Sequence, residues 1–137
     1  MTIECSQENL ETVVEKVLEL AGENAVVLLH GDLASGKTTL VQAFAKKLGI
    51  KEHVTSPTFS LQQQYGEKFF HYDIYNQGSE HFLELGLLEE LEKDGLHFIE
   101  WGDEKLENLL QSAGIKYLII SIEKISVSTR RYKVENA

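Results

Sequence analysis

The residues with the most specific chemistry in this sequence are eight consecutive positions, Gly31-Asp32-Leu33-Ala34-Ser35-Gly36-Lys37-Thr38. Their pattern, G-x-x-x-x-G-K-[ST], is typical of a loop whose backbone N–H groups surround a phosphate. Gly31 and Gly36 allow the backbone to turn closely around that phosphate. The helix that follows directs the positive end of its dipole at the same point. The pattern therefore predicts a nucleotide-binding P-loop.

Side chains of this loop have predicted roles in binding the nucleotide. Lys37 is placed to reach the β- and γ-phosphates as a cation, and the Thr38 hydroxyl is placed to bind Mg²⁺. Thr39 supports the α-phosphate side, and Ala34 and Ser35 complete the loop. The sequence lacks the N-K-x-D and D-x-x-G signatures of GTPases, so ATP is the expected nucleotide and Mg²⁺ the expected metal.

Two carboxylates are candidates for the acidic residue that a P-loop site needs beside its metal. Asp73 follows the run Phe69-Phe70-His71-Tyr72, and Glu100 follows Leu96-His97-Phe98-Ile99. Each alone could be an ordinary solvated carboxylate at a strand end. As a pair in a P-loop protein, one is expected to hold the metal and the other to orient the attacking water. The spacing does not assign the two roles.

A further polar segment follows the P-loop, Thr55-Ser56-Pro57-Thr58-Phe59. Hydroxyl groups such as that of Thr58, on a loop stiffened by proline, could sense the γ-phosphate or the metal as switch loops do. The alternative is a plain turn into the next strand.

The elements that must position these residues follow from hydrophobic periodicity. Helical spacing predicts a helix over 10–21 that ends at Gly22, and a second helix after the P-loop that ends at Gly49. Another helical stretch is predicted near 79–91, and another near 103–110. Strands are predicted at 25–29, 58–65, 68–75, 96–99, 117–122 and 130–134, with a hairpin connection at Gly66-Glu67.

Strands that alternate with helices favour a three-layer α/β fold of the P-loop NTPase type, with a mainly parallel central sheet and antiparallel strands at one side. No repeat, low-complexity tract or linker divides the chain. We therefore expect a single P-loop domain over residues 1–137.

Composition limits the classes of protein to which this chain could belong. The formal charge of −9 argues against a general nucleic-acid-binding surface. No apolar run is long enough to span a bilayer, and the single cysteine cannot form an internal disulfide. These features predict a cytoplasmic protein that is not associated with a membrane. Residues 52–115 hold 3 basic and 13 acidic residues, either a solvated surface or a docking face for a basic partner.

Four blocks of the sequence resemble the bacterial TsaE family of tRNA threonylcarbamoyladenosine biosynthesis ATPases, formerly called YjeE. They are the P-loop with Thr39, Ser56-Pro57-Thr58-Phe59, His71-Tyr72-Asp73-Ile74-Tyr75 and Ile99-Glu100-Trp101. The resemblance implies a P-loop ATPase with weak intrinsic turnover that acts with the proteins TsaB and TsaD. Together they install threonylcarbamoyl on adenosine 37 of tRNAs that read ANN codons, so tRNA is reached through the complex.

The resemblance also implies roles for single residues. Thr38 and Glu100 would be Mg²⁺ ligands, and Asp73 an active-site carboxylate. Trp101 would lie beside the nucleotide, and Thr58 in a switch-like loop. The segment Ser6-Gln7-Glu8 matches one that contacts the adenine side, and Arg130 matches an arginine that could contact the nucleotide.

This chain departs from the family pattern at several positions. Ala34-Ser35 replaces the usual Gly-Ala, which stiffens the loop slightly, and Gly102 stands where proline is frequent. Asn76 replaces the common arginine and removes a cation near Asp73. The histidines form no metal-like cluster in the sequence and are interpreted as surface or packing residues: His30, His53, His71, His81 and His97.

Other interpretations of the same residues are a small-molecule P-loop kinase and a non-catalytic, nucleotide-gated binding module. A kinase usually carries an arginine-bearing lid, yet both arginines of this chain, Arg130 and Arg131, are adjacent. That pair could also be an ordinary edge strand, whose basic residues discourage pairing with another sheet. Trp101 could likewise be a core or rim aromatic residue.

Overall fold

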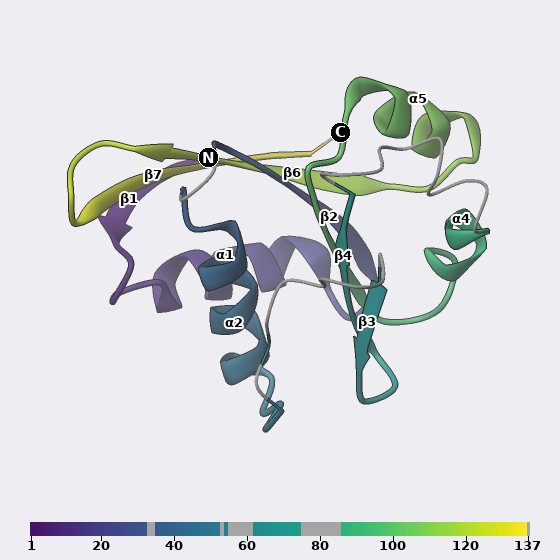
Figure 1. The fold of residues 1–137 in the computed structure, drawn as a ribbon, viewed down its shortest axis with the longest axis horizontal. Coiled ribbons are helices and arrows are strands. Elements are labelled where there is room, and N and C mark those ends of the chain that lie inside the picture. Colours follow the sequence, from purple (N-terminus) through teal and green to yellow (C-terminus); the bar gives the residue numbers. More distant parts are fainter. Residues whose placement is uncertain (33–34, 53, 55–61, 75–85, 137) are drawn as a thin grey trace.

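The computed structural model describes residues 1–32, 35–52, 54, 62–74 and 86–136, and Figure 1 shows their arrangement. The described strands form one sheet in the order β1-β7-β6-β2-β5-β4-β3. They are β1 (Thr2–Ser6), β2 (Ala25–His30), β3 (Gln62–Tyr65), β4 (Phe69–Asp73), β5 (Leu96–Glu100), β6 (Tyr117–Lys124) and β7 (Thr129–Asn136). The described helices are α1 (Glu11–Ala21), α2 (Lys37–Lys47), α4 (Leu87–Glu90) and α5 (Glu104–Ser112).

Parallel pairing occupies the centre of the sheet. Strand β2 pairs in parallel with both β5 and β6, and β4 pairs in parallel with β5. The residues of β2 from Val26 to Leu29 are all buried, as expected for a strand covered on both faces. The predicted α/β fold with a mainly parallel sheet is confirmed.

Antiparallel strands lie at both edges of the sheet, whereas the sequence placed them at one side. Strand β7 pairs antiparallel with β6 and with β1 at one edge, and β3 pairs antiparallel with β4 at the other. Local patterns identify hairpins such as the one around Gly66. They do not reveal on which side of the parallel strands each hairpin lies, because strand order depends on long-range pairing.

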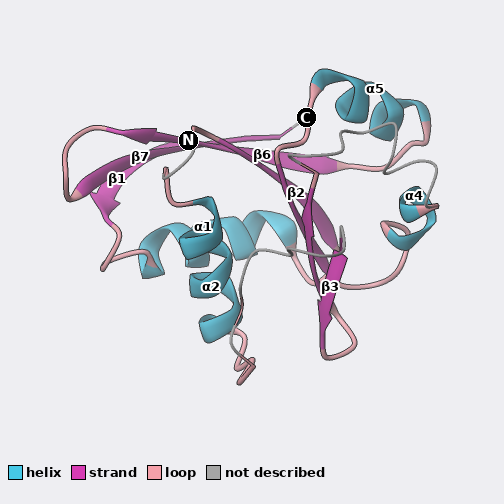
Figure 2. Cartoon of the chain, viewed as in Figure 1, coloured by secondary structure: helices cyan, strands magenta, loops and turns pink. Residues whose placement is uncertain are grey.

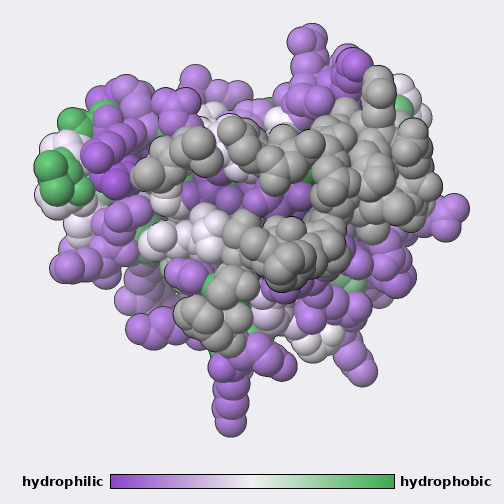
Figure 3. All heavy atoms as spheres, viewed as in Figure 1, coloured by the Kyte–Doolittle hydropathy of each residue, from purple (hydrophilic) through white to green (hydrophobic). Residues whose placement is uncertain are grey.

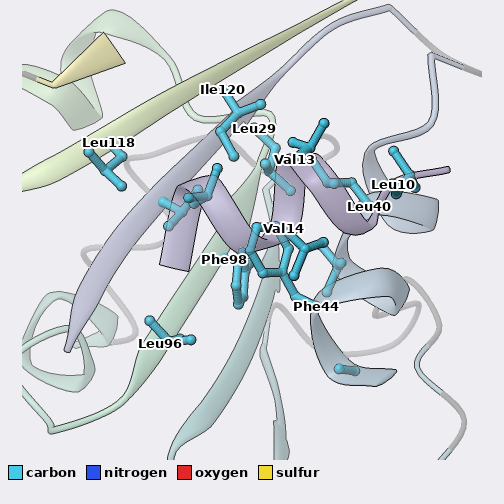
Figure 4. Close-up of a cluster of buried hydrophobic side chains, with 14 of the residues drawn as sticks. Leu10, Val13, Val14, Leu29, Leu40, Phe44, Leu96, Phe98, Leu118 and Ile120 are labelled. Atoms are coloured by element: carbon cyan, nitrogen blue, oxygen red, sulfur yellow. The ribbon is translucent and has the colours of Figure 1, made fainter. Parts of the chain in front are cut away.

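Helices cover both faces of the sheet, so the molecule has three layers (Figures 1 and 2). Side chains alternate along each strand, and this sends Val27 and Leu29 towards α1 and α2, where Phe44 and Phe98 also pack (Figure 4). The intervening Val26 and Leu28 face the opposite core, which includes Leu106 and Leu110 of α5. The predicted helices over 10–21 and after the P-loop are confirmed at the face that carries α1 and α2.

The sequence prediction missed the strand β1. It consists of five residues with one partly buried apolar side chain, Ile3, and Cys5 beside it, too short a pattern to indicate a strand by itself. Its pairing with β7 brings the segment before α1 against the C-terminal strand. Most of the helix predicted over 79–91 lies outside the described residues, as does the first part of the strand predicted over 58–65. None of the described helices has the length and apolar character needed to cross a membrane.

Candidate nucleotide-binding site

The P-loop connects the end of β2 to the start of α2, the strand–loop–helix setting that its motif requires. Gly31 has a φ of +153°, and a Cβ at this position would lie 2.6 Å from Ser35 Oγ and 2.9 Å from the carbonyl oxygen of Ile122. Gly36 has a φ of +106° and leaves space that the side-chain amide of Gln7 approaches. A larger residue would therefore clash with backbone at Gly31 and would be strained by the left-handed φ at Gly36.

Lys37 lies inside the loop and not in solvent. Its ammonium donates hydrogen bonds to the carbonyl oxygens of Gly31 at 2.7 Å and Asp32 at 3.0 Å, and it lies 3.8 Å from the ring centroid of Trp101. Burial lowers the pKa of Lys37, while the carboxylates of Glu100, Asp73 and Asp32 oppose that shift. The cation is thus held at the point where a phosphate would bind.

Thr38 and Glu100 form the hydrogen bond that joins the P-loop helix to β5. The Thr38 hydroxyl donates to Glu100 Oε2 at 2.9 Å and lies 3.2 Å from Oε1. The two meet because β2 and β5 are parallel neighbours, with Leu29 in register with Glu100. Only 3% of Glu100 is exposed, so this carboxylate faces the inside of the site.

Oxygen donors of this kind fit Mg²⁺, which prefers one or two protein ligands together with phosphate oxygens and water. Among the described residues no group of three or more His, Cys, Asp and Glu side chains could hold a metal on its own. The Thr38 hydroxyl and the Glu100 carboxylate therefore suit a metal whose coordination is completed by the phosphates of a nucleotide.

Asp73 ends β4 in register with Glu100 of the parallel strand β5. Both carboxylates consequently lie at the carboxyl edge of the sheet, beside the P-loop, as the sequence expected from their places at strand ends. Asp73 is half-buried, and its charge acts on Lys37. Glu100 touches Thr38 and Asp73 lies one strand further out, so Glu100 is the carboxylate that shares a site with the Thr38 hydroxyl.

His71 is a site residue that the sequence interpretation missed, because it treated the histidines as surface or packing residues. It is completely buried, and its Nε2 lies 2.5 Å from Glu100 Oε2. The signal that could have found it is its spacing, since His71 precedes Asp73 by two positions and must share a face of β4 with it.

Trp101 follows Glu100 directly and has a φ of +67°, the sole positive value among the described residues other than glycine. This backbone conformation is costly for a residue with a Cβ. It turns the chain out of β5 at the site, where the indole ring lies against the Lys37 ammonium. Trp101 therefore lies beside the P-loop, and it also packs against the core on the α5 face of the sheet.

Arg130 lies against the backbone of the P-loop. Its Nε donates to the carbonyl oxygen of Ser35 at 3.0 Å, and its Nη1 donates to Ser126 O at 3.0 Å in the turn between β6 and β7. The side chain is buried. The resemblance assigned Arg130 to the nucleotide, whereas the contacts in this structure support the loop that would hold the nucleotide.

A groove of about 500 Å³ lies next to the P-loop, between the start of α1 and the face of α2. Its lining includes Gln7, Glu8, Leu10, Thr39, Gln42 and Lys46. The volume is within the range of small-molecule sites, roughly 300–1,000 Å³. The sequence placed Gln7 and Thr39 at the nucleotide, and here the two residues share one groove. Ala34 and Thr58, also predicted at the site, lie outside the described residues.

Comparison with known proteins identifies the family. The family model described as "Threonylcarbamoyl adenosine biosynthesis protein TsaE" matches residues 5–132. A tRNA threonylcarbamoyladenosine biosynthesis protein TsaE from Treponema pallidum is 42% identical over 72% of this chain and 73% of its own length. The protein of that name from Bacillus subtilis is 31% identical over 78% of this chain and 74% of its own length.

A solved structure supports the fold. The crystal structure of YdiB from Bacillus subtilis superposes with a TM-score of 0.68 at 24% identity, and it covers 100% of this chain and 84% of the YdiB chain. The family match spans the P-loop, both carboxylates, His71 and Arg130. This chain belongs to the TsaE family of threonylcarbamoyl adenosine biosynthesis proteins.

Proposed function

We propose that this chain is the ATP-binding and ATP-hydrolysing subunit of a cytoplasmic system that installs threonylcarbamoyl on adenosine 37 of tRNAs reading ANN codons, acting with TsaB and TsaD. The observation that carries the ATPase assignment is the Thr38–Glu100 contact beside the buried Lys37 of the P-loop. Membership of the TsaE family supports the role in tRNA threonylcarbamoyladenosine biosynthesis.

Phosphate binding requires a rearrangement of Lys37. Its ammonium now satisfies the carbonyl oxygens of Gly31 and Asp32, and it would exchange these for the β- and γ-phosphate oxygens of ATP. Loop N–H groups and the N-terminus of α2 would add favourable dipoles at the same phosphates. The exchange is favourable because charged hydrogen bonds to phosphate are stronger than those to neutral carbonyls.

Thr38 and Glu100 would hold Mg²⁺ together with the nucleotide. When bound, the ion neutralises charge that builds up on the phosphates during hydrolysis. Glu100 is buried and therefore well placed to act strongly, because a charge away from water is screened little. Its negative charge also balances the Lys37 ammonium.

Asp73 would orient the attacking water. It lies at the end of β4, one strand from Glu100, and it is exposed enough for water to reach it. Thr58 would complete the γ-phosphate side once partners are bound.

The charge of the chain favours protein partners over direct tRNA contact. With a net charge of −9, the surface would repel a phosphate backbone, and the described face in Figure 3 is mostly hydrophilic. tRNA would therefore be bound by other subunits, and this chain would contribute nucleotide-driven conformational change.

ATP hydrolysis measured with and without TsaB and TsaD from the same organism tests the proposal. We expect slow turnover by the chain alone, stimulation by the two partners together, and loss of both in Lys37→Ala. Absence of ATP binding would contradict the nucleotide assignment. Turnover that neither partner alters would contradict the assignment to this tRNA modification while leaving the ATPase intact.

A further inference from the structure

The buried imidazole of His71 lies directly behind the Glu100 carboxylate. The distance from Nε2 to Oε2 is 2.5 Å, and the same Oε2 accepts the Thr38 hydroxyl at 2.9 Å. An ionised carboxylate only accepts hydrogen bonds, so Nε2 carries a proton and donates it. The other ring nitrogen, Nδ1, is buried without a hydrogen-bond partner in the described part of the chain.

The register of the sheet explains why this contact is built into the fold. Strands β4 and β5 are parallel, with Asp73 opposite Glu100 and His71 opposite Phe98. Residues two apart share a face of a strand. His71 therefore lies one step deeper than the two carboxylates, on the face that α2 and its Thr38 cover.

We infer that His71 is a positioning residue that fixes the Glu100 carboxylate for the metal of the bound nucleotide. The inference rests on the proposed function. Once the Thr38 hydroxyl turns to the metal, its contact with Glu100 is lost. The hydrogen bond from His71 to Glu100 then remains. It holds Oε2 in place and leaves Oε1 directed at the site.

A purely structural role explains these observations less well. A leucine would fill the same buried volume without an unsatisfied ring nitrogen, whose burial is unfavourable. The imidazole instead places its Nε2 against the Glu100 carboxylate, which leucine could not do. Hydrogen bonds to metal-ligating groups typically change metal affinity about 10–100-fold when they are removed.

Two isosteric variants separate the roles of the two ring nitrogens. Glutamine at position 71 can place its amide nitrogen near the site of Nε2, whereas asparagine can place it only near the site of Nδ1. Isothermal titration calorimetry measures the affinity for ADP, once in Mg²⁺ and once in EDTA. Electron paramagnetic resonance measures the binding of Mn²⁺ in the nucleotide complex. Neither readout depends on turnover.

We expect His71→Asn to weaken Mn²⁺ binding in the nucleotide complex about tenfold or more, with ADP affinity in EDTA unchanged. His71→Gln should remain close to the unsubstituted chain in both measurements. Metal binding by His71→Asn equal to that of the unsubstituted chain would overturn the inference, as would equal losses in the two variants.

The unsubstituted chain gives an independent test if the asparagine variant does not fold. Nitrogen-15 NMR of the histidine rings should show His71 protonated at Nε2, both without ligand and with Mg²⁺–ADP. A ring protonated only at Nδ1 would overturn the inference. If the unsubstituted chain binds no nucleotide at all, the proposed function fails; if it binds Mg²⁺–ADP and the asparagine variant binds it equally well, only the role of His71 fails.

Discussion

Arg130 holds the P-loop at Ser35 from a position 95 residues further along the chain, through a 3.0 Å hydrogen bond from Nε to the carbonyl oxygen. Its Nη1 donates at the same time to the carbonyl oxygen of Ser126 in the β6–β7 turn. One buried guanidinium therefore ties the loop to the antiparallel edge of the sheet. This contact fixes the position of Ser35 in the loop.

Arg130→Ala should destabilise the fold and weaken nucleotide binding together. The change leaves the carbonyl oxygen of Ser35 without its donor and empties a buried site, so we expect a loss of about 2 kcal/mol in the free energy of unfolding. Urea unfolding and ADP titration would measure the two effects. Arg131→Ala is the matched control, because Arg131 is exposed and makes surface ion pairs with Glu4 and Glu123. It should leave both quantities nearly unchanged.

Lys37→Ala should reduce ADP affinity about 10- to 100-fold, because a hydrogen bond to a charged group contributes about 1.5–3 kcal/mol. Urea unfolding should be measured alongside, since Lys37 also contacts the Trp101 ring and balances the charge of Glu100. Calorimetric titration with ADP gives the affinity. Lys116→Ala, an exposed lysine next to the start of β6, serves as the control; an equal loss there would point to net charge and not to the P-loop.

Thr38→Ala should separate metal-dependent from metal-independent binding. The variant loses the hydroxyl that faces Glu100 but keeps the loop backbone. We expect the affinity for Mg²⁺–ADP to fall about tenfold or more, while the affinity for ADP in EDTA stays the same. Equal affinities of this variant and the unsubstituted chain for Mg²⁺–ADP would remove Thr38 from the metal site.

The emission of Trp101 should report movement of Lys37. The chain contains one tryptophan, and the Lys37 ammonium lies 3.8 Å from its ring centroid. If phosphates draw the ammonium away, the field at the indole changes and its fluorescence shifts on addition of Mg²⁺–ADP. In Lys37→Met the emission without ligand should already differ from that of the unsubstituted chain. Unchanged emission at saturating Mg²⁺–ADP would show that Lys37 does not leave the ring.

Sequence alone predicted the parts of the site that lie close together in the chain. The strand, glycines, Lys37 and Thr38 form one continuous pattern, and Glu100 was found because it ends an apolar run. The Thr38–Glu100 contact then favours Glu100 over Asp73 for the metal, which spacing could not decide.

Contacts between distant residues were not predicted from the sequence: His71 was missed as a site residue, and Arg130 was expected at the nucleotide and not at Ser35. His71 meets Glu100 across 29 positions and Arg130 meets Ser35 across 95, and no local pattern encodes such pairs. Strand β1 and the position of the antiparallel edges depend in the same way on pairing with distant strands.

His97 should make the fold less stable in mild acid. The buried ring stacks on Phe70 with centroids 4.3 Å apart, and its Nδ1 and Nε2 bond to the Tyr72 hydroxyl and the Lys93 carbonyl oxygen, both at 2.8 Å. Burial lowers the pKa of His97 below its ordinary value of 6.5, against the attraction of Glu90.

The sign of the effect follows from that lowered pKa. Consider a pH between the pKa of His97 in the folded chain and its pKa in the unfolded chain. There the unfolded chain binds more protons at His97 than the folded chain does, so the free energy of unfolding rises with pH. The contribution is fully present above the unfolded pKa of 6.5 and is lost as the pH falls towards the folded one. Urea unfolding between pH 7.5 and 5.5 should show this loss, and His97→Gln, which does not titrate, should show a smaller slope even if it is less stable overall. Equal slopes in the two proteins would assign the acid sensitivity to other groups.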